Sequence, residues 1–312
     1  MSSPFLRKSL LGFSALTLLA LPGCFVNNYP REEAAQRIAS PAWMVDREVN
    51  IGDYAIRVYE RMHERYADGH IYIEGDGVTH TRHRSSRFRS YNPTPVNPVA
   101  LHLAAHDNAE NVAYIARPCQ YTGMNKEEKV CGAELWGEAR YSDDAVAIIN
   151  DTINEIKARY NLKDIHLVGY DGGGAIAAIL AAKRDDVASL RTVAGILDHN
   201  AFTSYHEVPP FTESLNPIDF ADGLYNVPQH HYIGGQDEYV TPVVLHSYLQ
   251  AVGQTNCIHY TYIQEAEHEA GFVEKWPDLL HDEPACTGPR RDFLLDPPSE
   301  IFFVEREKPE KP

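Results

Sequence analysis

The chain has 312 residues, with 44 acidic against 28 basic side chains and a formal net charge of −16. Nucleic acids and anionic membrane surfaces repel so acidic a protein, which argues against both as partners. The length is sufficient for one large domain or two small ones.

The first 23 residues have the pattern of an export signal. A basic pair precedes an apolar stretch over residues 10–21, which is too short for a membrane span of roughly 20 residues. The stretch ends in Leu21-Pro22-Gly23-Cys24, which resembles the lipobox of bacterial lipoprotein precursors. The resemblance implies removal of residues 1–23 and a lipid on Cys24. An ordinary cleaved signal with an incidental cysteine is the alternative.

We therefore expect a cell-envelope protein that is anchored to the membrane by its lipid and faces the periplasm. Phe25, rather than Asp, follows the lipidated cysteine. In lipoproteins of this kind that favours the outer membrane. Residues 24–45 are polar and mixed and are expected to form a tether. Residues 291–312 are rich in proline and charge and are expected to form a C-terminal tail.

Between residues 46 and 290, apolar segments alternate between strand and helix patterns. Strands are expected within residues 49–62, 70–74, 112–116, 165–169, 190–196, 230–233 and 257–263. Helices are expected at residues 99–105, 142–160, 175–183 and 243–252. Strands that alternate with helices at this spacing predict an α/β domain with a mostly parallel sheet covered on both faces.

Four cysteines remain besides Cys24, and an exported chain meets an oxidising environment. An even number of cysteines predicts two disulfides, for which three pairings are possible. The two local pairings, Cys119–Cys131 and Cys257–Cys286, are the ones we expect. None of the cysteine spacings resembles a zinc site.

One glycine-rich turn is the candidate for the catalytic site. Gly169-Tyr170-Asp171-Gly172-Gly173 lies between a buried strand and an alanine-rich helix. This is the context of a nucleophile elbow, written G-x-S-x-G in serine hydrolases, where glycines are needed because the turn is strained and crowded. The alternative for Asp171 is a simple helix N-cap, a role that aspartate fills well.

The remaining parts of a catalytic triad follow in the chain order nucleophile, acid, histidine. Asp237 comes after the strand at residues 230–233, and His268 comes after the last strand. A carboxylate at residue 237 would orient the imidazole and stabilise its charged form. The oxyanion hole is expected from the main-chain N–H groups of Gly172 and of either Asp76 or Gly77.

With these parts in place, residues 72–280 resemble the α/β-hydrolase family, and closely a group of bacterial exported hydrolase-like lipoproteins. The segments that carry the resemblance are residues 72–77, 116–121, 168–174, 193–199, 214–217 and 276–277. It implies an α/β-hydrolase domain over residues 46–290, with a sheet of about eight strands and a small lid near residues 198–228. It also implies hydrolysis of esters or related small molecules without a metal or an organic cofactor.

The departure from the family is Asp171, because the elbow of that family carries serine. One interpretation is an Asp-nucleophile enzyme, like the epoxide and haloalkane hydrolases of this fold. Against it, Gly172 replaces the tryptophan of dehalogenases, whereas Tyr205 and Tyr225 lie in the lid where epoxide hydrolases place two tyrosines. A second interpretation is a weak hydrolase whose serine was lost. A third is a non-catalytic envelope protein that binds a ligand in the old cleft.

Further residues are expected to contact a small-molecule substrate. Arg82 lies in a basic loop after the expected oxyanion turn. Tyr170 lies in the elbow, directly before Asp171, and Tyr205 lies in the expected lid. An arginine there would clamp a substrate carboxylate or phosphate. His102 and His106 lie one helical turn apart, but no third ligand accompanies them, so no metal site is predicted.

Overall fold

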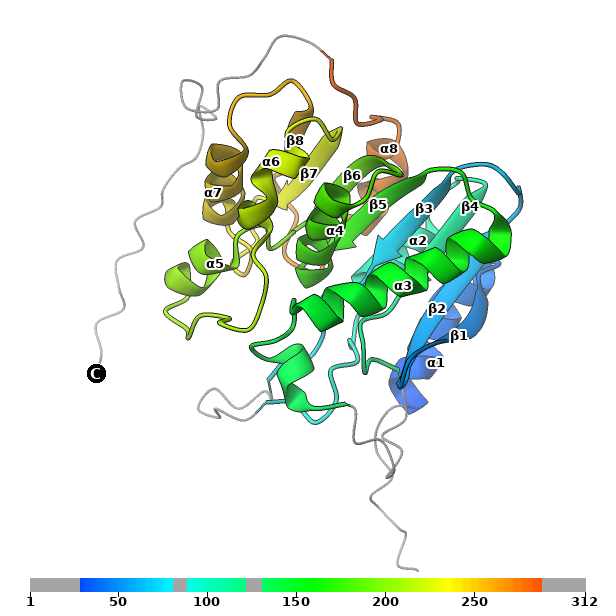
Figure 1. Cartoon of the computed structure of the whole chain (residues 1–312). Helices are drawn as coiled ribbons and strands as arrows, with labels where there is room; N and C mark the ends of the chain where they lie inside the picture. The colour runs from blue at the N-terminus through cyan, green and yellow to red at the C-terminus, as the bar shows by residue number, and fades with distance from the viewer. Residues whose placement is uncertain (1–28, 81–88, 122–130, 288–312) are drawn as a thin grey trace, which may run out of the picture.

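A computed structural model describes residues 29–80, 89–121 and 131–287 of the chain. Its centre is a single eight-stranded sheet with the strand order β1-β2-β4-β3-β5-β6-β7-β8 (Figure 1). The signal segment, Cys24, Arg82 and the expected C-terminal tail lie outside the described residues.

The sheet is antiparallel at one edge and parallel elsewhere. β2 pairs antiparallel with both β1 and β4, and every later pairing in the sheet is parallel. The strands are β1 Val45–Ile51, β2 Tyr54–Met62, β3 Gly69–Ile73, β4 Asn111–Ile115, β5 Ile165–Tyr170, β6 Val187–Val193, β7 Gln229–Gly234 and β8 Ile258–Ile263. The prediction of a mostly parallel sheet of about eight strands is confirmed.

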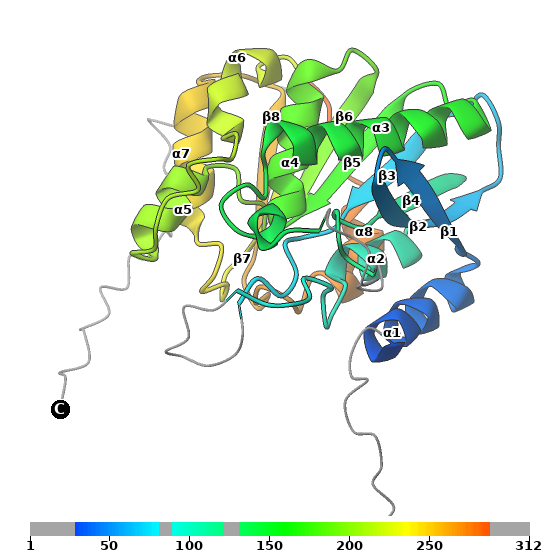
Figure 2. The same ribbon diagram turned by 60° about the horizontal axis from the view of Figure 1, so that its bottom comes forward.

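Helices cover both faces of the sheet (Figures 1 and 2). One face carries α1 Tyr29–Ala39, α2 Val99–Ala105 and α8 Trp276–Leu279. The other carries α3 Asp143–Tyr160, α4 Gly172–Lys183, α6 Ala221–Leu224 and α7 Pro242–Val252, with α5 His199–Tyr205 packed against α7. Short 3₁₀ turns occupy Ser40–Ala42, Ala133–Trp136, Pro217–Phe220 and Val273–Lys275.

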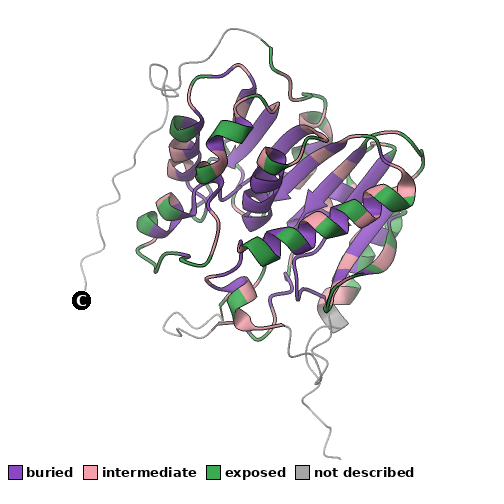
Figure 3. Cartoon of the chain, viewed as in Figure 1, coloured by how far each residue is buried: buried purple, intermediate pink, exposed green. Residues whose placement is uncertain are grey.

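Because each central strand lies between two helix layers, its residues are buried on both faces, as the purple strands of Figure 3 show. The helix α3 follows the expected pattern closely. Ser142 is its N-cap and its side chain accepts a hydrogen bond from the Ala145 N–H, while apolar residues such as Ile149 and Ile153 face the sheet.

The N-terminal part of the domain differs from the expectation in two places. The tether expected over residues 24–45 is wrong from residue 29 onward, because α1 is a packed helix in which Ala35 and Ala39 are fully buried. The single strand expected over residues 49–62 is a hairpin of β1 and β2. Ile51 pairs with Tyr54, and the two-residue turn between them includes Gly52 at a φ of 56°.

Residues 198–228, the expected lid, form α5, a 3₁₀ turn and α6 between β6 and β7. Asp198 caps α5 by accepting hydrogen bonds from the N–H groups of Asn200 and Ala201. The aromatic rings of Phe202 and Phe211 from this segment are buried. The segment is therefore a compact helical insertion with its own packed aromatic contacts.

Both disulfides form in the expected local pairing, Cys119–Cys131 and Cys257–Cys286. The first disulfide starts at Cys119, shortly after the end of β4. The second joins Cys257, at the start of β8, to Cys286 near the C-terminal end of the described chain. No helix within the described ranges combines the length and the apolar character that a membrane span requires.

Candidate active site

The elbow at Asp171 has the strained geometry that its glycines predict. Asp171 lies between β5 and α4 with φ 50° and ψ −122°, a conformation that side-chain-bearing residues rarely adopt. Its side chain makes no capping hydrogen bond to α4, so a simple helix N-cap does not account for it. A Cβ atom on Gly173 would lie 2.2 Å from the Ile73 carbonyl oxygen, which explains why glycine follows the elbow so closely.

The carboxylate of Asp171 is held by the loop that follows β3. The Asp76 N–H donates a hydrogen bond of 2.9 Å to Asp171 Oδ2. The Gly172 N–H also lowers the pKa of Asp171, since it stabilises the ionised carboxylate. Of the two donors expected after β3, the structure uses Asp76 and not Gly77. The Asp76 N–H therefore points at an oxygen of Asp171 itself.

The other oxygen of the elbow carboxylate is left free. Asp171 Oδ1 is buried and has no hydrogen-bond partner in the described part of the chain, and it lies 3.7 Å from His268 Nε2. His268 Nδ1 lies 2.9 Å from Asp237 Oδ2. A carboxylate accepts the proton at Nδ1, so Nε2, which faces Asp171, is the basic nitrogen of neutral His268.

Burial and neighbouring charges shift the pKa values of Asp171 and His268. Burial, together with the nearby Asp76 carboxylate, raises the pKa of Asp171 to about 6, although His268 offsets part of the effect. Burial alone would lower the pKa of His268, but its hydrogen bond to Asp237 and the charge of Asp171 outweigh burial and raise it. Asp171 therefore changes protonation near neutral pH, and its charge favours the protonated form of His268.

The Asp76 side chain is fixed by a buried cluster that the sequence analysis did not anticipate. Arg117 Nη1 lies 3.1 Å from Asp76 Oδ1, and Arg140 Nη1 lies 2.8 Å from Asp76 Oδ2. The Tyr141 hydroxyl donates to the same Oδ2 at 2.8 Å. The two guanidinium groups keep the pKa of Asp76 low despite its burial. The Asp76 N–H is thereby held rigidly against Asp171.

Two further contacts support this loop. Gln120 Nε2 donates to the Gly75 carbonyl at 3.0 Å, and the Gly75 N–H donates to Glu74 Oε1 at 2.9 Å. Burial raises the pKa of Glu74 to about 7. Segment 116–121 was noted for its resemblance to the family, which was the only signal for Arg117 and Gln120. No sequence signal marked Arg140 or Tyr141.

The expected substrate-contact residues are placed differently from one another. Tyr170 is buried, its ring lies 5.4 Å from the His268 ring, and its hydroxyl donates to the His268 carbonyl at 3.1 Å. It thus supports the histidine loop. Tyr205 is 54% exposed on α5, with His206 and Tyr239 between it and His268. Tyr225 packs against the hydrophobic core.

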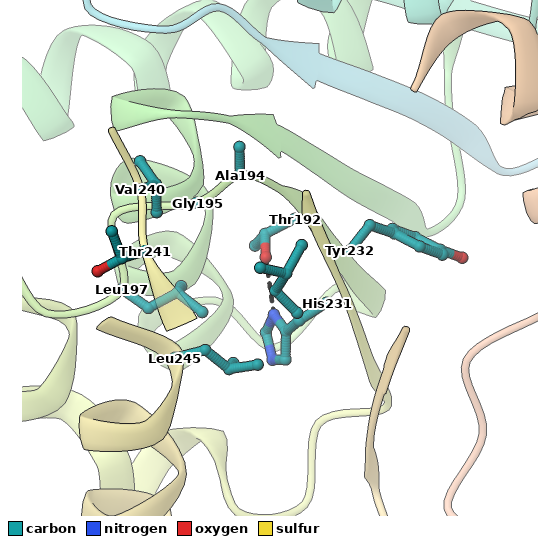
Figure 4. Close-up of a pocket in the computed structure, with 10 residues that line it drawn as sticks. Thr192, Ala194, Gly195, Leu197, His231, Tyr232, Val240, Thr241 and Leu245 are labelled. Atoms are coloured by element: carbon teal, nitrogen blue, oxygen red, sulfur yellow. Dashed lines mark hydrogen bonds between the residues drawn. The ribbon is translucent and has the colours of Figure 1, made fainter. Parts of the chain in front are cut away.

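A water-sized cavity lies one strand away from the elbow, between β6, β7 and α7 (Figure 4). Thr192 Oγ1 lies 2.7 Å from His231 Nδ1 at its wall, and the Thr241 hydroxyl there is buried and without a partner among the described side chains. It is too small for a substrate. The same ranges of the chain hold no group of three or more His, Cys, Asp or Glu suited to a metal ion.

No protein-family model and no curated protein sequence matches the chain. Solved structures do. The esterase Pf2001 from Pyrococcus furiosus is 12% identical with a TM-score of 0.52, over 77% of this chain and 92% of that one. Est1E from Butyrivibrio proteoclasticus is 15% identical with a TM-score of 0.51, over 75% and 95%.

A third similar structure is the acylaminoacyl peptidase from Pyrococcus horikoshii, at 10% identity and a TM-score of 0.54, over 79% of this chain and 42% of the peptidase. Together with the strand order and the strained elbow, these similarities show that the chain has the α/β-hydrolase fold. At identities of 10–15% these similarities show the fold alone.

Proposed function

We propose that the protein is a hydrolase that uses the Asp171 carboxylate as its nucleophile. The observation that carries the proposal is that the two oxygens of this carboxylate have different surroundings. Oδ2 accepts the Asp76 N–H, whereas Oδ1 has no hydrogen-bond partner among the described residues and faces His268. A carboxylate held in this way presents one lone, oriented oxygen for attack.

The same arrangement disfavours ordinary ester hydrolysis. In a serine hydrolase the oxyanion donors bind the substrate's carbonyl oxygen. Here the Asp76 N–H is directed at Asp171 itself. Attack of a carboxylate on an ester carbonyl would also produce an anhydride, which is energetically uphill. A saturated carbon with a leaving group is the better electrophile, because attack there produces a stable alkyl ester on Asp171.

The second half-reaction follows from the same distances. Neutral His268, oriented by Asp237 at 2.9 Å, takes a proton from water at Nε2, and the water attacks the Asp171 ester carbon. The negative charge then develops on the Asp171 oxygen that already lies against the Asp76 N–H. The oxyanion hole thus stabilises the tetrahedral intermediate of the enzyme's own ester.

The test is to trap that ester. The His268→Gln variant, incubated with a primary alkyl bromide or a terminal epoxide, should accumulate one covalent adduct, which peptide mass analysis should locate at Asp171. Asp171→Asn should not react. His281→Gln changes an exposed histidine and is the matched control, which should turn over like the wild type. Absence of an adduct with both probes would refute the nucleophile.

We also propose that the protein is a lipoprotein of the cell envelope, anchored through Cys24 and facing the periplasm. The lipobox-like ending and two disulfides support this placement. Only residues 25–28 separate Cys24 from α1, so the folded domain would lie close to the membrane. Metabolic labelling with a fatty acid should mark the wild type and not Cys24→Ala; equal labelling would contradict the anchor.

A further inference from the structure

The peptide unit between Gly75 and Asp76 is hydrogen-bonded at both of its ends. Its N–H, which belongs to Asp76, donates to Asp171 Oδ2 at 2.9 Å. Its carbonyl oxygen, which belongs to Gly75, accepts a hydrogen bond of 3.0 Å from Gln120 Nε2. Donation to a carbonyl polarises the whole peptide unit, so the N–H at its other end becomes a stronger donor. Gln120 therefore acts on Asp171 through a single peptide unit.

Gly75 has no side chain with which to fix this peptide unit. A Cβ atom on Gly75 would lie 2.9 Å from both Cβ and Oδ2 of Asp171, so the close approach of the loop to the elbow requires glycine. Glycine leaves the backbone conformationally free, and its orientation then depends on hydrogen bonds from its neighbours. Glu74 Oε1 accepts the Gly75 N–H at 2.9 Å, and Gln120 binds the Gly75 carbonyl.

The side-chain amide of Gln120 is itself held in one orientation. The Arg117 N–H lies 3.1 Å from Oε1 of Gln120. A main-chain N–H can only donate, so the atom that it contacts is the amide oxygen, and the amide nitrogen is left to face the Gly75 carbonyl. Gln120 is buried, which shields both hydrogen bonds from solvent.

The backbone on either side of Gln120 is strained. Cys119 has a φ of 70° and Tyr121 a φ of 58°, in the left-handed region that residues other than glycine rarely adopt. The disulfide to Cys131 restrains Cys119, and the Tyr121 N–H donates to Thr94 Oγ1 at 2.8 Å. Such strain persists only where the surrounding structure maintains it, and it is concentrated at functional sites. Here the strained segment directs Gln120 toward the loop that holds the elbow carboxylate.

We propose that Gln120 is a positioning residue that favours breakdown of the Asp171 ester over its formation. This inference rests on Asp171 as the nucleophile. When the ester forms at Oδ1, Oδ2 changes from a carboxylate oxygen into a carbonyl oxygen and loses negative charge, so a strong bond from the Asp76 N–H opposes this step. When water then adds to the ester carbon, negative charge returns to Oδ2, and the same bond stabilises the transition state.

The test measures the two half-reactions separately in Gln120→Met, which keeps the length of the side chain and removes its donor. We expect breakdown of the Asp171 ester to slow by about tenfold, which is less than the roughly 10²–10³-fold effect of losing a whole oxyanion donor. Alkylation of Asp171 by a primary alkyl bromide should keep its rate or become faster. Breakdown is followed by single-turnover kinetics with His268 present, and alkylation by intact-protein mass in the His268→Gln background.

A spectroscopic measurement reports the same contact without turnover. The amide proton of Asp76 should titrate in NMR spectra with the Asp171 carboxylate, whose pKa is about 6 and would be higher without that N–H. A weaker donor stabilises the ionised carboxylate less, so the midpoint of this titration should rise in Gln120→Met.

Gln229→Met is the matched control. Gln229 is also fully buried, and its Nε2 donates to the Leu224 carbonyl at 2.7 Å. It lies at the amino end of β7, whereas the elbow follows the carboxyl end of β5. Its substitution should change neither the two rates nor the midpoint of the Asp76 titration.

The outcomes separate this inference from the proposed function. Slower breakdown without slower alkylation, together with a higher midpoint, would support the inference. Equal slowing of both half-reactions would give Gln120 a merely structural role and overturn it, as would unchanged breakdown or the same effects in Gln229→Met. No alkylation of Asp171 in the His268→Gln protein itself would remove the proposed function and this inference with it.

Discussion

Burial of the Asp171 carboxylate should cost the protein stability, and the cost should depend on pH. The pKa of Asp171 is raised to about 6, against 3.8 for an aspartate of ordinary environment. Because the folded-state pKa is the higher one, folding favours the protonated form, and this group's contribution becomes less favourable as pH rises from about 4 to about 6. The raised pKa of Asp171 thus destabilises the fold by about 3 kcal/mol at pH 8, where the buried group is ionised, and by about 1 kcal/mol at pH 4.5, where it takes up a proton on folding.

The Asp171→Asn variant removes this titration while it preserves the shape of the side chain. We expect its free energy of unfolding, relative to wild type, to increase by about 2 kcal/mol between pH 4.5 and pH 8. A constant loss from the amide group cancels in this difference. Urea unfolding followed by circular dichroism at both pH values measures it.

Asp185→Asn, which replaces an exposed carboxylate, provides the background for that comparison. A difference between Asp171→Asn and wild type that stays the same at the two pH values would refute the reasoning. It would mean that the elbow carboxylate is solvated in the folded protein. A difference of the opposite sign would mean that the N–H groups of Asp76 and Gly172 stabilise the charge by more than burial penalises it.

Three other changes test the site. Asp171→Ser frees the Asp76 N–H for a substrate carbonyl and should raise hydrolysis of an activated aryl ester by about 10²-fold or more over wild type; no gain in a colorimetric assay would contradict an intact oxyanion hole. Asp237→Asn should slow breakdown of the Asp171 ester by about 10³–10⁴-fold in single-turnover kinetics, since His268 loses its orienting carboxylate. Unchanged kinetics would exclude the triad. Gly172→Ala should lower the free energy of unfolding by about 1–3 kcal/mol, because its Cβ would lie 1.9 Å from Asp76 Oδ1; a neutral effect in urea unfolding would show that the Asp76 side chain is mobile.

The elements that the sequence predicted well are those whose signal is local. The helix over residues 142–160 has an N-cap serine and an apolar stripe, and the structure begins it at Asp143 and ends it at Tyr160. The elbow is defined by five consecutive residues. By contrast, α1 was missed because it buries small residues, Ala35 and Ala39, which produce only a weak apolar pattern.

The arginine cluster was missed for a different reason. An arginine in a connecting segment is usually solvated, and it becomes a buried partner only when a carboxylate from elsewhere meets it. Asp76 is 41 residues from Arg117 and 64 from Arg140 along the chain. The residues next to Arg117 and Arg140 in the sequence give no indication of the contact with Asp76.

The sequence by itself thus determined the order of strands and helices from β3 onward, the position of the elbow and the succession Asp171, Asp237, His268, since each depends on neighbouring residues or on chain order. Only the tertiary structure decided which carboxylate oxygen of Asp171 is held and which is free, and that Tyr239 stands beside His268. Those facts depend on distances between loops that meet at the carboxyl ends of four different strands, and no periodicity along the chain encodes such distances.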